Sequence, residues 1–295
     1  MSARGRAELA LLAVTLVWGA SFTLVKSALG DASTVIFLAL RFAAATFFLA
    51  LFARRALATG LMMDPLAWQG GWRAGLCLAA AYLCQTAGLR HTSAGKSAFI
   101  TSLCTVLVPF FAAAVYHTKP HRSELTGVAI AMLGMGLLTI PGAEATLGRG
   151  EWLTLGGAAA FAAHIVVTGH YAGRAGVNAF SLLQLGAASL IFLVALPWFE
   201  PVRLDLTPRL LAALAVTALL CTAVAFTVQA WAQRHTTPTR AGLIFATEPV
   251  SAAATAWLAS GETLPPLGWA GAALVLAGVV AVDLKPTPPG RHPQT

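Results

Sequence analysis

The residue with the clearest chemical potential in this sequence is a carboxylate inside a long apolar run. Glu248 lies in the segment 238–259, PTRAGLIFATEPVSAAATAWLA, which is long enough to cross a bilayer. At about 1.5 Å of rise per residue, Glu248 would lie roughly 15 Å into a hydrocarbon layer about 30 Å thick. A charge at that depth is costly unless it is neutralised, paired or in contact with water. Glu248 is therefore predicted to serve a function.

Pro249 follows directly and supports the same interpretation. A proline inside a helix has no N–H to donate, and it leaves the carbonyl one turn earlier without a partner. Lipid cannot satisfy that carbonyl, but a polar cavity can. We therefore predict that this segment forms one wall of a solute pathway.

The first two apolar runs also carry groups that are unusual in a membrane. Trp18 and Gly19 lie near the middle of the first run, where the indole N–H either has a polar partner or the ring packs between helices. Lys26 lies near the outer end of the same run and can extend its ammonium to the surface. Arg41 lies roughly 12 Å into the second run. Arg41 is expected to pair with a carboxylate or with backbone carbonyls, as a structural pin or as a gate.

Further polar residues lie where they could line a cavity. Tyr82 and Gln85 share one face of the third run, and Gln85 and Gln229 are expected to hydrogen-bond across the bundle, as interhelical contacts or in the cavity. Lys96 could meet a substrate carboxylate, as Arg41 could.

Thr101 and His164 complete the predicted substrate-binding set, and Pro109 is predicted to have a gating or structural role. Thr101 lies on one face of the fourth run, before Pro109, and suits either a cavity lining or a bond to its own helix. His164 lies near the middle of the sixth run, either as a hydrogen-bonded core residue or as a second group that handles protons.

The composition places these groups in a membrane protein. Of 295 residues, 58% are apolar and 10% are charged, and the mean hydropathy is +0.76; a soluble domain carries about 25% charged residues. The predicted fold is all-α, with transmembrane helices at Leu9–Leu29, Ser33–Ala53, Trp72–Leu89, Ser97–Tyr116, Leu125–Ile140, Trp152–His170, Ala179–Trp198, Leu210–Ala232, Ala241–Ala259 and Leu267–Leu284.

The charge distribution predicts an orientation. With the N-terminus in the cytoplasm, twelve of the 19 Lys and Arg residues fall inside, six fall outside and one lies within the membrane, which satisfies the positive-inside rule. The net charge of +8 is thus an orientation signal and not a nucleic-acid site. The first run is too long for a signal peptide and is predicted to be retained. Residues 286–295 are predicted to be a disordered cytoplasmic tail.

The spacing of the cysteines does not indicate a metal site. The four cysteines, Cys77, Cys84, Cys104 and Cys221, have no metal-ligand spacing and are interpreted as core residues. We expect no metal, no cofactor and no catalytic residue.

The chain contains an internal repeat. At an offset of 144 residues, the RHT triplet at 90–92 matches that at 234–236, and Gln85 matches Gln229. The halves are predicted to be 1–144 and 145–285, with five helices each. Because five is odd, the second half must enter the membrane from the opposite face. The predicted architecture is therefore ten transmembrane helices in two inverted repeats.

The repeat leaves one alignment open. A constant offset pairs Cys104 with Glu248, whereas pairing Pro109 with Pro249 needs a slip of four residues, about one helical turn. In either case the fourth and ninth runs differ most between the halves, as a specific substrate site requires.

Small residues recur in the fifth and tenth runs. Gly127 and Gly134, and their repeat mates Gly271 and Gly278, have seven-residue spacing. Such stripes allow close helix packing and could form the seam of a homodimer.

These features together resemble the EamA type of the drug/metabolite transporter superfamily. The residues that carry the resemblance are Trp18-Gly19 with Phe22 and Lys26, Arg41-Phe42, Pro109, Glu248-Pro249 and Gly261-Glu262. The resemblance implies export, or less often uptake, of small metabolites such as amino acids through a central cavity between the halves. It maps the family's Glu-Pro pair onto Glu248 and Pro249, and its Trp-Gly pair onto Trp18 and Gly19.

The expected function is a secondary transporter in the inner membrane of a bacterium, with both termini in the cytoplasm and proton coupling through Glu248 as an option. No nucleotide-binding motif is present, so a gradient must drive any uphill transport. The alternatives are a passive facilitator or channel and, less favoured, an intramembrane enzyme, which would need more than one deep acid.

Overall fold

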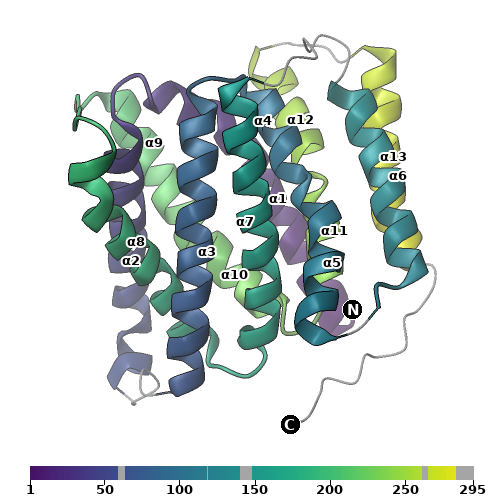
Figure 1. Cartoon of the computed structure of the whole chain (residues 1–295), viewed down its shortest axis with the longest axis horizontal. Helices are drawn as coiled ribbons and strands as arrows, with labels where there is room; N and C mark the ends of the chain where they lie inside the picture. Colours follow the sequence, from purple (N-terminus) through teal and green to yellow (C-terminus); the bar gives the residue numbers. More distant parts are fainter. Residues whose placement is uncertain (59–63, 118, 140–147, 261–264, 284–295) are drawn as a thin grey trace.

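A computed structural model gives the structure of residues 1–58, 64–117, 119–139, 148–260 and 265–283. The predicted tail and the Gly261-Glu262 pair lie outside these ranges. The described residues form a helical bundle (Figure 1) with one isolated β-bridge, between Ala32 and Leu204. Its helices are α1 (Ala3–Ala28), α2 (Thr34–Ala58), α3 (Pro65–Leu89), α4 (Ala94–Ser102), α5 (Cys104–Tyr116), α6 (Arg122–Thr139), α7 (Arg149–Ala172), α8 (Val177–Phe199), α9 (Pro208–Ala218), η2 (Leu219–Val224), α10 (Ala225–Ala232), α11 (Pro238–Phe245), α12 (Glu248–Ser260) and α13 (Pro266–Asp283).

The all-α prediction is confirmed, and helix is found within each predicted apolar run. Six helical segments among the described residues are both long enough and apolar enough to cross a membrane, at Ala3–Ala28, Thr34–Arg54, Ala94–Tyr116, Arg149–Ala172, Val177–Phe199 and Pro208–Ala232. The chain is therefore a multi-pass membrane protein.

The fourth and ninth runs are not continuous helices, so the prediction was wrong on this point. The N–H of Leu103 donates to the carbonyl of Ile100 at 3.1 Å, and the N–H of Thr247 donates to that of Ile244 at 3.0 Å. These three-residue hydrogen bonds tighten the last turns of α4 and α11 and end each helix before the next begins. Pro249 then lies in the first turn of α12, where a missing N–H costs nothing.

The bounds of the broken helices resolve the open alignment. The helix α5 begins at Cys104 and α12 begins at Glu248, which are 144 residues apart. The N-caps Ser93 and Thr237, which precede α4 and α11, show the same offset. Cys104 is therefore the counterpart of Glu248, and no slip of four residues is needed.

The broken helices of the two halves run in opposite directions. The helix α4 packs beside α12 and α5 packs beside α11, and in Figure 1 α4 lies above α5 while α12 lies above α11. One contact that joins them is the hydroxyl of Thr105 in α5, which donates to the carbonyl of Gly242 in α11 at 2.8 Å. The two breaks thus face each other near the middle of the bundle.

The glycine stripes pack α6 against α13 within one chain. A Cβ added at Gly134 would lie 2.6 Å from the carbonyl oxygen of Gly271, and one at Gly278 would lie 2.7 Å from that of Gly127. The two helices lie side by side at one edge of the bundle (Figure 1). These faces are therefore buried within the chain and are not available as the predicted homodimer seam.

Two loops at one end of the bundle are joined by a charged cluster. The Asp31 carboxylate accepts hydrogen bonds from Arg209 at 2.8 and 3.0 Å and from the Thr207 hydroxyl at 2.7 Å. The hydrogen bond from Arg209, followed by that from Thr207, holds the pKa of Asp31 below its usual value. The cluster connects the α1–α2 loop to the segment that precedes α9.

The depressed pKa of Asp31 predicts a pH-dependent stability. A carboxyl with a lowered folded pKa contributes stability above its unfolded pKa of about 3.9, and that stability is lost as the pH falls through the folded pKa. Asp31→Asn is therefore expected to lower the melting temperature at neutral pH and to reduce its decrease on acidification. Asp205→Asn, in the same cluster of loops, is the control; equal pH profiles for Asp31→Asn and the wild type would contradict the assignment.

Candidate functional site

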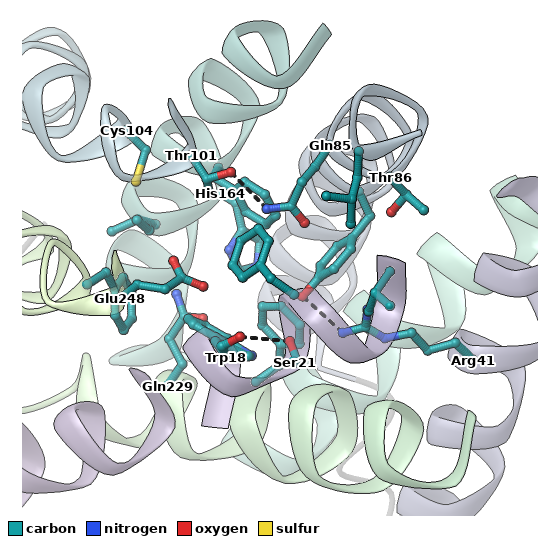
Figure 2. Close-up of a pocket in the computed structure, with 18 residues that line it drawn as sticks. Trp18, Ser21, Arg41, Gln85, Thr86, Thr101, Cys104, His164, Gln229 and Glu248 are labelled. Carbon is teal, nitrogen blue, oxygen red and sulfur yellow. Dashed lines mark hydrogen bonds between the residues drawn. The ribbon is translucent and has the colours of Figure 1, made fainter. Parts of the chain in front are cut away.

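A cavity lies between helices of both predicted halves. The volume open to the centres of water molecules is about 50 Å³. On the same measure, a single bound water needs roughly 10–15 Å³. The cavity can therefore hold several waters or part of a small solute. Its walls (Figure 2) are Trp18, Ser21, Phe22, Val25, Arg41, Tyr82, Gln85, Thr86, Leu89, Thr101, Cys104, Phe161, His164, Ile165, Phe226, Gln229, Phe245 and Glu248.

Glu248 presents its carboxylate to this cavity. It is the first residue of α12 and not part of a continuous helix, and only 7% of the residue is exposed. Gly19 allows α1 to approach the backbone at this point, since a Cβ there would lie 2.7 Å from the carbonyl oxygen of Glu248. Among the described residues, the carboxylate has no hydrogen-bond or ion-pair partner. It is thus an open acceptor for a ligand.

Arg41 reaches the cavity from the opposite side (Figure 2). Its Nε donates to the Thr222 hydroxyl at 2.8 Å, and its Nη2 donates to the Tyr82 hydroxyl at 3.2 Å. The guanidinium also lies 4.5 Å from the centre of the Tyr82 ring, a cation–π contact. The structure shows no carboxylate partner for Arg41 in the described residues, so the predicted pairing with a carboxylate or carbonyl was wrong.

The π-helical turn η2 interrupts the eighth predicted helix and supplies contacts to both sides of the cavity. The Thr222 hydroxyl, which accepts from Arg41, donates to the carbonyl of Thr217 five residues earlier, the register of a π-helix. The carbonyl of Cys221 accepts the indole N–H of Trp18 at 2.8 Å. This contact supplies the polar partner that the sequence predicted as one option for Trp18.

Aromatic rings form much of the remaining wall. The centre of the Trp18 ring lies 5.3 Å from that of Phe226 and 5.1 Å from that of Phe245. The ring centres of Tyr82 and Phe161 are 5.2 Å apart. Such tilted and edge-on pairs hold the rings in fixed positions. The cavity therefore combines an apolar wall with a few polar groups, as binding sites for small molecules do.

The neutral polar groups of the cavity are held by neighbouring side chains. The Nε2 atom of His164 lies 2.9 Å from the amide oxygen of Gln184. Because that oxygen can only accept, Nε2 carries the proton and Nδ1 is left as an acceptor. The amide nitrogen of Gln85 donates to the Thr101 hydroxyl at 2.9 Å.

Gln229 does not bond across the bundle as expected. Its amide nitrogen donates to Gln233 one turn later in the chain at 2.9 Å, and its amide oxygen is buried without a hydrogen-bond partner. That unsatisfied oxygen lies on the same cavity as Glu248.

Two predicted lysines lie outside the cavity lining. Lys96, expected to meet a substrate, instead lies 3.6 Å from the carboxylate of Glu151. Lys26, expected to reach the outer surface, donates to the carbonyls of Leu89 and Thr92, so it caps the end of α3. The cavity lining also lacks Gly19, Pro109 and Pro249. These residues could therefore act only by shaping the helices.

Sequence reasoning missed part of the wall. Cys104 was interpreted as core, and Phe161, Phe226 and Phe245 could not be told from ordinary packing residues. The repeat contained one usable signal, because the constant offset maps Cys104 onto Glu248 and Thr101 onto Phe245.

The chain thus combines a multi-pass helical membrane fold with a cavity lined by residues of both predicted halves. The sequence profile of the EamA-like transporter family matches the chain twice, over residues 5–140 and 148–282. The chain therefore belongs to the EamA-like transporter family. It is 29% identical over 281 residues to an uncharacterized transporter of Archaeoglobus fulgidus. The aligned region covers 95% of this chain and 86% of that protein. A solved crystal structure shares the fold with a TM-score of 0.77 and 17% identity, over 95% of this chain and 98% of the other.

Proposed function

We propose that the chain is a secondary transporter of small zwitterionic metabolites, such as amino acids or related compounds. One observation carries this proposal: Glu248 and Arg41 face the same cavity from opposite sides, and neither has an oppositely charged partner among the described residues. A buried charge without a partner is costly. A ligand with a cationic and an anionic group compensates both charges at once.

The roles follow from the chemistry of each group. Glu248 accepts the ammonium of the substrate, and Arg41 donates to its carboxylate through a guanidinium that Thr222 and Tyr82 hold in place. The aromatic wall contacts an apolar side chain. Lys96, which is paired with Glu151, has no part in this binding.

The architecture we propose for transport is two inverted halves, 1–144 and 145–285, that form ten spans and expose the cavity alternately to either side. The antiparallel packing of α4–α5 against α11–α12 supports this arrangement. We place the chain in the inner membrane of a bacterium with both termini in the cytoplasm, and the distribution of Lys and Arg supports this orientation.

The proposed driving force is a proton gradient. A deep carboxylate that lacks a protein partner is stable when it binds a proton or a cationic group, and it can exchange one for the other. Competition between proton and substrate ammonium at Glu248 would couple their movements in opposite directions.

Proteoliposomes test this function. Wild-type protein is reconstituted and given a radiolabelled apolar amino acid, with and without a pH gradient. We expect saturable transport and accumulation only with the gradient. Saturable transport that never accumulates solute would indicate a passive facilitator, and no transport of any amino acid tested would overturn the proposal.

Arg41 is predicted to select for the substrate carboxylate. Arg41→Met should lower the ratio of transport of an apolar amino acid to transport of its decarboxylated amine by about tenfold or more, because only the amino acid needs the guanidinium. Tyr82→Phe keeps the aromatic ring beside Arg41 and is the matched control, with a much smaller effect. An unchanged ratio in Arg41→Met would remove Arg41 from the site.

A further inference from the structure

Among the ion pairs of the described residues that join the predicted halves outside the cavity, two involve a broken helix, whereas Arg209–Asp31 joins two loops. In one, Lys96 of α4 lies 3.6 Å from Glu151 of α7. In the other, Arg240 of α11 lies 3.4 Å from Glu8 of α1. In each pair the cation is near the start of a broken helix, and the acid is near the start of an unbroken helix from the other half.

The two pairs occupy equivalent places in the repeat. Lys96 and Arg240 are 144 residues apart. Five and eight residues after Lys96 come the cavity residues Thr101 and Cys104; five and eight residues after Arg240 come Phe245 and Glu248.

The acids show the same regularity. Trp18 follows Glu8 by ten residues, and Phe161 follows Glu151 by ten residues; both rings line the cavity. Ten residues of helix span about 15 Å. Each ion pair therefore lies at a similar distance from the cavity, although the acids are 143 residues apart and the cations 144.

The pairs lie at opposite ends of the bundle. Because α4 packs beside α12 and α5 beside α11, the first turns of α4 and α11 point to opposite ends (Figure 1). The cavity lies between them. Each side chain is at most 24% exposed, so the pairs lie within the bundle and not on its solvated rim.

Each acid keeps a partner when its ion pair breaks. Glu151 also accepts from the N–H of Gly148 at 2.9 Å, in its own helix N-terminus, and from the Thr92 hydroxyl of the other half at 2.6 Å. Glu8 also accepts from Arg4, one turn away on α1, at 2.7 Å. The distances to Lys96 and Arg240 are longer than the roughly 2.7–2.9 Å of a tight charge-assisted bond. Separation of either pair therefore leaves no isolated acid.

We propose that these ion pairs are the two closures of the cavity: Lys96–Glu151 closes one end, Arg240–Glu8 closes the other, and each opens in turn. This inference rests on the proposed transport function. With the N-terminus in the cytoplasm, Lys96–Glu151 is the outer closure and Arg240–Glu8 is the inner one. The structure holds both pairs formed.

The native thiol of Cys104 reports which end is open, since it lines the cavity. Cys77, Cys84 and Cys221 are replaced by Ala, and the rate of labelling by a membrane-impermeant maleimide is measured from the outer face in cells and from the inner face in inverted vesicles. Neutralising one closure should shift the equilibrium between the two open states by about two- to fivefold, the range for a partly exposed ion pair.

The expected signs are opposite for the two closures. Glu151→Gln, which can still accept from Gly148, should raise labelling from the outer face and lower it from the inner face. Glu8→Gln should do the reverse. Lys96→Met removes the other partner of the outer closure and should change the rates in the same directions as Glu151→Gln, and it replaces that variant if Glu151→Gln does not fold. Glu124→Gln is the control: this half-buried acid of α6 accepts from the N–H of His121 and lies outside the cavity lining, so the change should alter neither rate.

The possible failures are distinguishable. Labelling rates that change in the same direction at both faces, or not at all, while the wild type transports solute, would overturn the closures and leave the proposed function. Opposite changes in labelling in a protein that transports no amino acid would support the closures and overturn the proposed function.

Discussion

Glu248→Gln is expected to reduce the initial rate of amino acid uptake into proteoliposomes by roughly 100-fold or more, equivalent to about 3 kcal/mol. The amide matches the shape of the carboxylic acid, but it can neither compensate an ammonium nor exchange a proton. The carboxylate has no partner among the described residues. Folding therefore loses no interaction in the variant.

The melting temperature separates this effect from misfolding. We expect that of Glu248→Gln to stay within a few degrees of the wild-type value, since a buried charge is removed and no protein group loses a bond. Glu248→Asp keeps the charge but shortens its reach, and should retain intermediate activity. The control is Glu124→Gln, far from the cavity. Wild-type rates in Glu248→Gln would remove the main residue of the site.

Gly19→Val is expected to cause the largest loss of stability, about 3 kcal/mol or more, together with loss of transport. A Cβ at this position would lie 2.7 Å from the carbonyl oxygen of Glu248 and from the Cβ of Ser251, and 2.8 Å from the nitrogen of Ala252. Two of these three atoms are backbone and cannot rotate away. The side chain would therefore push α1 away from α12 and displace Trp18 from the cavity.

The measurement for this position is thermal unfolding in detergent, followed by transport. Gly19→Ala should give a smaller decrease in melting temperature than Gly19→Val. The matched control is Gly95→Ala in α4, where an added Cβ meets nothing within 4 Å and Ala is the better helix former. It should be neutral or stabilising. Equal melting temperatures for Gly19→Val and the wild type would mean that α1 and α12 do not pack as described.

The sequence predicted the helical class because hydropathy reports directly on which segments are apolar. It could not predict the breaks before Cys104 and Glu248, because a helix that ends and restarts within a few residues keeps the same composition. The π-helical turn could not be predicted for the same reason, because its sequence, LLCTAV, is typical of an ordinary apolar α-helix. Only packing against Trp18 and Arg41 distinguishes it.

The cavity was partly predictable because polar residues are rare in apolar runs. That rarity singled out Glu248, Arg41 and His164, which all line the cavity. The same criterion failed for Lys96, because a cation near a helix end can equally meet an acid of another helix, and Glu151 is distant in sequence. The partner of Arg41 was mispredicted because a neutral hydroxyl and an aromatic face leave no charge signal in the sequence.

The central claim is that the side chain at position 248 faces a wet passage between the two halves. The most direct measurement is the reaction of Glu248→Cys, with the four native cysteines replaced by Ala, with a small charged methanethiosulfonate reagent in membranes. We predict that the folded protein is modified from the aqueous phase and that the transported amino acid slows the reaction. A thiol that reacts only after denaturation would show that this position faces lipid or dry packing, and would contradict the account.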